Sequence, residues 1–216
     1  MDIFSRISEY RAESEKLSWS GTFRDYIDIL RRDNSPAMTA HARVYDMIVS
    51  HGVEESGGSK KYKFFNSEIF GLDQTMEKLV EEYFHSAARR LDVRKRILLL
   101  MGPVSGGKST IVTLLKKGLE QYSRTSRGAV YAIKGCPMQE DPLHLIPDEL
   151  RPEIEKELGV RIEGDLCPSC QMRLKTEFGN DIEQVPIERV LISEKNRVGI
   201  GTFSPSDPKS QDIADL

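Results

Sequence analysis

The feature that most constrains this chain is an eight-residue segment, residues 102–109, with the sequence GPVSGGKS. It matches the pattern G-x-x-x-x-G-K-[ST] in full. Five apolar residues, 97–101, precede it and are typical of a strand buried on both faces of a parallel sheet. Apolar residues at helical spacing follow over 111–119, and residues 128–133 have the composition of another strand. This order of strand, loop, helix and strand predicts a βαβ unit and therefore an α/β fold with a parallel sheet.

Each residue type in this loop has a separate role in binding phosphate. The glycines allow backbone angles that turn N–H groups inward, and the following helix brings the positive end of its dipole to the same point. Lys108 is predicted to reach the β- and γ-phosphates, Ser109 to hold Mg²⁺, and Thr110 to assist. A glycine-rich turn with an accidental lysine is the alternative, but the flanking strand and helix favour nucleotide binding. The predicted contact set is Gly102, Pro103, Val104, Ser105, Gly106, Gly107, Lys108, Ser109 and Thr110, with the anion held by the backbone of residues 104–107.

A nucleotide triphosphatase also needs a second carboxylate at the end of a hydrophobic strand, where it orders Mg²⁺ and the attacking water. The nearest candidate is residues 190–194, with the sequence VLISE. Its Ser-Glu ending is a poor match. We therefore expect that strand to lie beyond the end of this chain, which would make the chain the N-terminal part of a longer protein.

Composition divides the chain into three regions. Residues 1–65 are charged and helix-rich, with helices expected near 23–30 and 44–49, and the polar stretch 54–61 (EESGGSKK) predicts a linker. We place the boundary of a small helical domain at residue 65. The second region starts with a long amphipathic helix over 72–91, for which Asp73 could serve as N-cap. Prolines break up residues 135–216, which contain one expected helix (152–158) and short strands at 190–192 and 198–203.

Charge and cysteine content narrow the function classes. Lys and Arg number 31 against 34 Asp and Glu, a net charge of −3, which argues against a dedicated nucleic-acid-binding protein. No apolar run approaches the roughly 20 residues that span a bilayer, and the first residues lack the apolar core of a secretory signal. The odd number of cysteines, 3, argues against a disulfide scaffold. We expect a cytoplasmic protein that does not contact a membrane.

The cysteines suggest a possible metal site. Cys167 and Cys170 form a C-x₂-C pair, whose spacing lets two thiolates bind one Zn²⁺. Cys136 could be a third ligand and His144 a fourth, within a Cys-containing insertion near residues 135–172. Free thiols and a redox-active pair remain open as alternatives.

Several segments together resemble one known family. Residues 19–26 (WSGTFRDY), 40–48 (AHARVYDMI) and 69–73 (IFGLD), with the phosphate loop, look like the opening of the PrkA-type bacterial serine protein kinases. The resemblance extends over essentially the whole chain. It implies an ATPase domain of the AAA+ type, so we expect a truncated AAA+ phosphate-loop core over 66–216, preceded by the helical domain. It also implies that Ile69, Phe70 and Gly71 pack around adenine.

The resemblance implies an ATP-dependent serine protein kinase, with ATP and Mg²⁺ as cofactors, a protein substrate and a homo-oligomeric full-length form. Lys108 would then be its catalytic residue in this chain. The kinase signatures G-x-G-x-x-G, H-R-D and D-F-G are absent from the sequence, so the kinase activity rests on the resemblance alone. Two alternatives remain: an ATP-driven remodelling or protease-coupled AAA+ module, and a docking module that binds nucleotide without catalysis.

Overall fold

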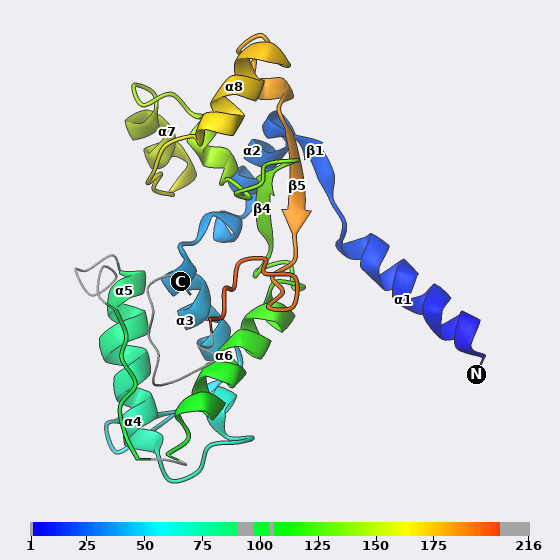
Figure 1. Cartoon of the computed structure of the whole chain (residues 1–216). Helices are drawn as coiled ribbons and strands as arrows, with labels where there is room; N and C mark the ends of the chain where they lie inside the picture. The colour runs from blue at the N-terminus through cyan, green and yellow to red at the C-terminus, as the bar shows by residue number, and fades with distance from the viewer. Residues whose placement is uncertain (1, 90–96, 104–105, 204–216) are drawn as a thin grey trace, which may run out of the picture.

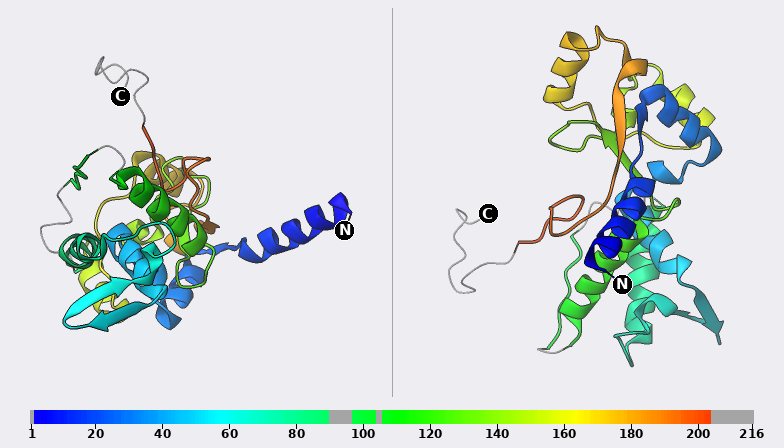
Figure 2. Two further views of the ribbon diagram at one scale, coloured as in Figure 1. Left: turned by 90° about the horizontal axis from the view of Figure 1, so that it is seen from below. Right: turned by 90° about the vertical axis from the view of Figure 1, so that its right-hand side faces the viewer.

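The computed structural model describes residues 2–89, 97–103 and 106–203 (Figure 1). It combines helices with a small sheet and a hairpin. The helices are α1 (Ile3–Leu17), α2 (Phe23–Arg32), α3 (Ala40–Ser50), α4 (Asp73–Lys78), α5 (Ser86–Ala88), α6 (Lys108–Tyr122), α7 (Arg151–Leu158) and α8 (Pro168–Thr176). The strands are β1 (Ser20–Thr22), β2 (Val53–Ser56), β3 (Ser59–Tyr62), β4 (Val130–Ile133) and β5 (Pro186–Val190). Helix α1 extends away from the rest of the molecule (Figures 1 and 2).

The main sheet has the strand order β1-β5-β4, and both pairings are antiparallel. Gly21 lies opposite Ile187, and Ala132 lies opposite Glu188. The predicted strand at β4 is confirmed, and β5 overlaps the strand expected at 190–192 by one residue. No parallel pairing occurs among the described residues, so the prediction of a parallel sheet is wrong for this structure.

The apolar segment 97–101 accounts for that difference. It belongs to no strand, and Ile97 and Met101 are 93% and 82% exposed, respectively. Only Leu100 packs against the hydrophobic interior. An apolar run forms a strand buried on both faces only inside a sheet, where strands pair with its edges and helices cover its two faces. Within the described residues, β4 pairs with β5 instead, and no strand is placed beside 97–101.

The stretch predicted as a linker, 54–61, forms a hairpin of β2 and β3 instead. Gly57 and Gly58 form its two-residue turn with φ of 60° and 83°, the left-handed values that a tight hairpin turn requires. Glu55 pairs opposite Lys60 and brings unlike charges together. The prediction of a linker is therefore wrong here: the acidic residues before the glycines and the basic residues after them face each other across paired strands.

The buried apolar residues form two clusters. The upper core lies around α2, β4, β5, α7 and α8, and the lower core lies around α3, α6 and the helix that runs from α4 to α5. Each core includes residues from both sides of residue 65, because Phe23 packs in the upper core with Ile187, and Met47 packs in the lower core with Ile111. The boundary expected there does not separate two cores, and the division into two domains stays a prediction about the whole protein.

Most of the expected helices are confirmed, including those realised as α2, α3, α6 and α7. The long helix expected over 72–91 begins at Asp73, with Leu72 as its N-cap, and a π-helical segment, Leu79–His85, joins α4 to α5. The end of that prediction, residues 90–91, lies outside the described residues.

Residues 198–203, expected to be a strand, form none; Val198 makes an isolated bridge with Ser193. Among the described residues, no helix is both long and apolar enough to cross a membrane.

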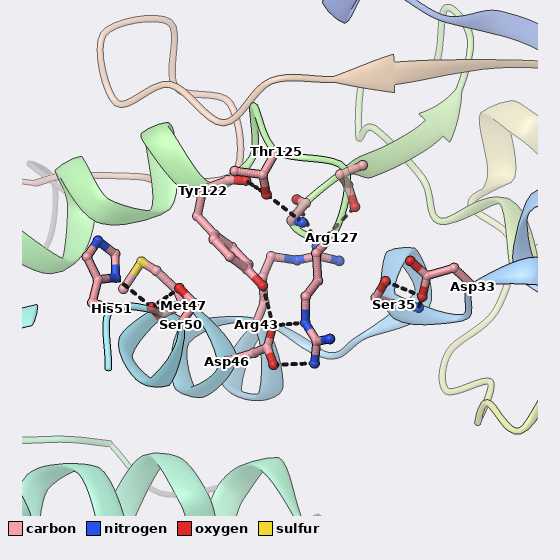
Figure 3. A network of polar contacts seen from close by, with 12 residues as sticks. Asp33, Ser35, Arg43, Asp46, Met47, Ser50, His51, Tyr122, Thr125 and Arg127 are labelled. Atoms are coloured by element: carbon pink, nitrogen blue, oxygen red, sulfur yellow. Dashed lines mark hydrogen bonds and ion pairs between the residues drawn. The ribbon is translucent and has the colours of Figure 1, made fainter. Parts of the chain in front are cut away.

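A network of polar contacts links α3 to the segment between α6 and β4 (Figure 3). The buried Arg43 guanidinium donates hydrogen bonds to the carbonyl oxygens of Gly128 and Ala129 across the interface, and to those of Pro36 and Met38 nearer its own helix. Asp46, one turn along, accepts from Tyr122 and Arg127. These contacts fix the C-terminal end of α6 and, with it, the direction in which the helix leaves the phosphate loop.

Close packing between α3 and α6 also depends on Gly118. A Cβ atom added there would lie 2.8 Å from Met47 Sδ and 2.8 Å from the Phe64 ring. Replacing glycine with alanine in an exposed helix adds about 1 kcal/mol of stability, whereas overpacking a core costs about 1–3 kcal/mol. We therefore expect Gly118→Ala to lower the free energy of unfolding by about 1 kcal/mol, measured by urea denaturation. A more stable variant would show that Met47 and Phe64 can move aside.

Candidate functional site

The glycine-rich loop leads directly into α6. Residues 102, 103 and 106–109 are described, whereas Val104 and Ser105 lie outside the described residues. Gly107 is the N-cap of α6 and has a φ of 75°, a left-handed conformation that favours glycine. No side chain caps this end of the helix. The first N–H groups of any helix lack an intrahelical acceptor, and at α6 they add to the positive end of the helix dipole, which suits an anion.

The Lys108 side chain folds back over the loop. Its Nζ donates hydrogen bonds to the carbonyl oxygens of Gly102 at 2.9 Å and of Pro103 at 2.5 Å. The N–H of Gly106 donates to the same Pro103 oxygen at 3.2 Å. Phosphate oxygens are stronger acceptors for an ammonium group than these neutral carbonyls, so a nucleotide can replace them. Ser109 is exposed in the first turn of α6, where its hydroxyl is open to a metal ion.

The segment predicted to contact adenine lies beside this loop. The added Cβ of Gly107 would be 3.8 Å from Leu72 Cδ1, so the start of α4 adjoins the start of α6 (Figure 1). Ile69 is buried in the lower core, whereas the Phe70 ring is 79% exposed. Gly71 has a φ of 73°, which turns the chain into α4. The structure thus places Leu72, the residue after this segment, beside the phosphate loop and leaves the Phe70 side chain exposed.

The candidate second carboxylate does not reach the loop. Glu194 accepts hydrogen bonds from Lys116 Nζ at 2.6 Å and from Thr202 Oγ1 at 2.6 Å. The Lys116 contact holds the pKa of Glu194 below its usual range. At a rise of 1.5 Å per residue, Lys116 is about 10 Å along α6 from Ser109. Residues 190–194 therefore stabilise the later part of α6 and do not serve the loop.

The three cysteines lie together in the upper core. Their sulfur atoms are all within 4.8 Å of one another, and Cys136 Sγ is 3.7 Å from Cys167 Sγ. His144, expected as a fourth ligand, is not part of this group. Its Nδ1 contacts a Glu140 carboxylate oxygen at 2.5 Å and its Nε2 contacts the Glu163 carbonyl oxygen at 2.8 Å. Both ring nitrogens are therefore engaged elsewhere.

The protein environment shifts the pKa values of Cys136 and Cys170 in opposite directions. Burial raises the pKa of Cys170, and the neighbouring sulfur atoms of Cys136 and Cys167 raise it further. Burial also raises the pKa of Cys136, but hydrogen bonds, chiefly from the Glu140 N–H, outweigh it and leave that pKa lowered. The sequence analysis missed Glu140, whose carboxylate also accepts the Cys167 N–H at 3.1 Å. Its position four residues before His144 was the available signal.

Comparison with known proteins gives consistent matches. The family model described as the PrkA AAA domain matches residues 21–216. A Bacillus subtilis protein named ATP-dependent protease PrkA is 63% identical over all 216 residues, which cover 34% of its own length. The Escherichia coli K12 protein named serine/threonine kinase YeaG is 31% identical across the whole chain and 35% of its own length. A Geobacillus stearothermophilus protein, named only as uncharacterized, is 58% identical over 97 residues, its full length.

The chain thus spans about a third of the length of the B. subtilis and E. coli relatives. No solved structure matches it.

Proposed function

Because the chain belongs to the PrkA AAA domain family, we propose that it binds Mg·ATP through residues 102–109. The observation that carries the proposal is the Lys108 ammonium group, held over a glycine loop at the uncapped start of α6. Lys108 would bind the β- and γ-phosphates, Ser109 would hold Mg²⁺ with Thr110 beside it, and the N–H groups of residues 104–107 would cradle the anion.

Adenine would lie against the segment Ile69, Phe70 and Gly71. The position of Leu72 close to Gly107 supports this placement, because Leu72 directly follows the segment. The exposed Phe70 ring offers a face on which a purine can stack.

For the use of ATP, we propose phosphoryl transfer to serine in a cytoplasmic protein substrate, by a homo-oligomeric full-length protein. The printed name of the E. coli relative supports a kinase. The printed name of the B. subtilis relative, an ATP-dependent protease, supports the second candidate, a protease-coupled AAA+ module. Both candidates need the same nucleotide site, and neither calls for a nucleic acid or a membrane.

In the test, the full-length protein is incubated with ATP and with unfolded casein as substrate, and the products are identified. Label from γ-³²P-ATP on casein serine supports the kinase, whereas ATP-dependent cleavage of casein peptide bonds supports the protease-coupled module. Binding of ATP with neither product would leave the docking module as the function. A full-length protein that does not bind ATP in isothermal titration would contradict the whole proposal.

A further inference from the structure

The cysteine cluster joins two segments that lie far apart in the sequence. Cys136 follows β4 in a tight loop, held by hydrogen bonds from its N–H to the Ile133 carbonyl oxygen and from the Gln139 N–H to its own carbonyl oxygen. Cys167 is the N-cap of α8, and Cys170 lies in the first turn of that helix. The loop and the helix meet through packing, through these sulfur atoms and through hydrogen bonds such as the one that Arg173 donates to the Lys134 carbonyl oxygen, at the end of the molecule opposite the phosphate loop (Figure 1).

The distances between the sulfur atoms match those of a metal site. Tetrahedral zinc holds thiolates at about 2.3 Å, which places any two sulfur ligands about 3.8 Å apart. Cys136 and Cys167 are 3.7 Å apart, and all three sulfur atoms lie within 4.8 Å of one another. A disulfide would use only two of them and would bring those two to about 2.0 Å. A bound metal ion explains why three thiols lie this close together, whereas a disulfide does not.

The backbone supplies a hydrogen-bond donor to one of the sulfur atoms. The Cys170 N–H donates to Cys167 Sγ at 3.4 Å, and the positive end of the α8 dipole lies at the same place. The Glu140 carboxylate holds both the Cys167 N–H and His144, which fixes the first turn of α8 against the loop after β4. Cys136 and Cys170 are buried, whereas Cys167 is half-exposed and leaves a path for an oxygen ligand.

We propose that Cys136, Cys167 and Cys170 bind one structural Zn²⁺, with an oxygen atom as the fourth ligand and His144 outside the ligand set. Each thiol loses its proton when the metal binds. The ion links the loop after β4 to α8 and so stabilises the upper core. This inference is independent of the nucleotide site, because the cysteines and the phosphate loop belong to different cores.

The test begins with the full chain purified in the presence of a reductant. Elemental analysis is expected to give one zinc per chain, and zinc X-ray absorption is expected to show three sulfur atoms at about 2.3 Å and one oxygen. Removing the metal with a chelator should lower the thermal midpoint by roughly 10 °C, and adding ZnCl₂ back should restore it. Cys170→Ser should lose the zinc, whereas Ser169→Ala, in the same turn of α8, should keep it.

Two results would overturn the proposal. The first is a metal-free wild-type chain whose thermal midpoint does not rise when ZnCl₂ is added, a measurement that does not depend on whether Cys170→Ser folds. The second is a metal-free chain in which Cys136 and Cys167 form a disulfide, which would make them a redox pair. The signal of an imidazole ligand in the absorption spectrum would contradict the proposed ligand set, because it would show that a histidine such as His144 binds the metal.

Discussion

Replacing Lys108 with alanine is expected to lower the affinity of the chain for Mg·ATP about 100-fold while leaving its fold intact. Each charge-assisted hydrogen bond to phosphate contributes about 1.5–3 kcal/mol, so losing one or two of them costs about 3 kcal/mol, or two powers of ten in Kd. The fold should tolerate the change, because the contacts that Lys108 makes, to the carbonyl oxygens of Gly102 and Pro103, are exposed.

The measurement is isothermal titration of the wild type and the variant with Mg·ATP and with ADP. The loss should be larger for ATP, since a lysine at this position reaches the γ-phosphate. Lys117→Ala is the matched control, because Lys117 is exposed on the same helix and lies away from the loop. Equal affinity of the wild type and Lys108→Ala for ATP would show that Lys108 does not bind the phosphates.

The local patterns of the sequence predicted local structure well. Apolar residues three and four apart predicted α2, α3 and α6, because one face of a helix is determined by residues close together in the chain. The loop motif likewise placed a glycine at position 107, where the chain adopts a left-handed conformation. Cys167 and Cys170 are separated by about one helical turn, so their spacing alone placed the two thiols together.

Pairing between distant segments was not predictable in this way. The apolar residues 97–101 indicate burial, but an apolar run does not specify which strand will lie beside it. Strand β5 lies between β1 and β4, so residues more than 160 positions apart share a sheet, as Ser20 and Glu188 do. His144 lies outside the cysteine cluster because Glu140 and the Glu163 carbonyl oxygen contact its two ring nitrogens. The position of Glu140 four residues before His144 was a signal for the first contact, whereas no sequence pattern indicated the second.

Arg43 has a structural role that the sequence pattern did not reveal. It lies in the segment 40–48 that carries the resemblance to the family, and an arginine is seldom fully buried unless it is paired. The structure buries it and surrounds it with backbone carbonyl oxygens from both sides of the interface (Figure 3). Burial lowers the pKa of Arg43, but an arginine pKa is high enough that the guanidinium stays charged.

Arg43→Met is therefore expected to lower the free energy of unfolding by about 4 kcal/mol. Methionine fills much of the same volume but offers no donor, so the carbonyl oxygens of Gly128, Ala129 and Pro36 lose their partner away from water. A buried polar group left unpaired costs about 1–3 kcal/mol, and several share the loss here. Urea denaturation monitored by circular dichroism measures the difference.

Two further variants separate the buried hydrogen bonds from charge and volume. Arg43→Lys keeps the charge but cannot reach carbonyl oxygens on both sides of the interface, so we expect it to lose about half as much stability. Arg127→Ala removes a guanidinium that pairs with Asp46 in the same network but is 66% exposed, and it should cost less than about 1 kcal/mol. If Arg127→Ala proved as damaging as Arg43→Met, the ion pair with Asp46, and not the buried carbonyl contacts, would hold α3 to the end of α6.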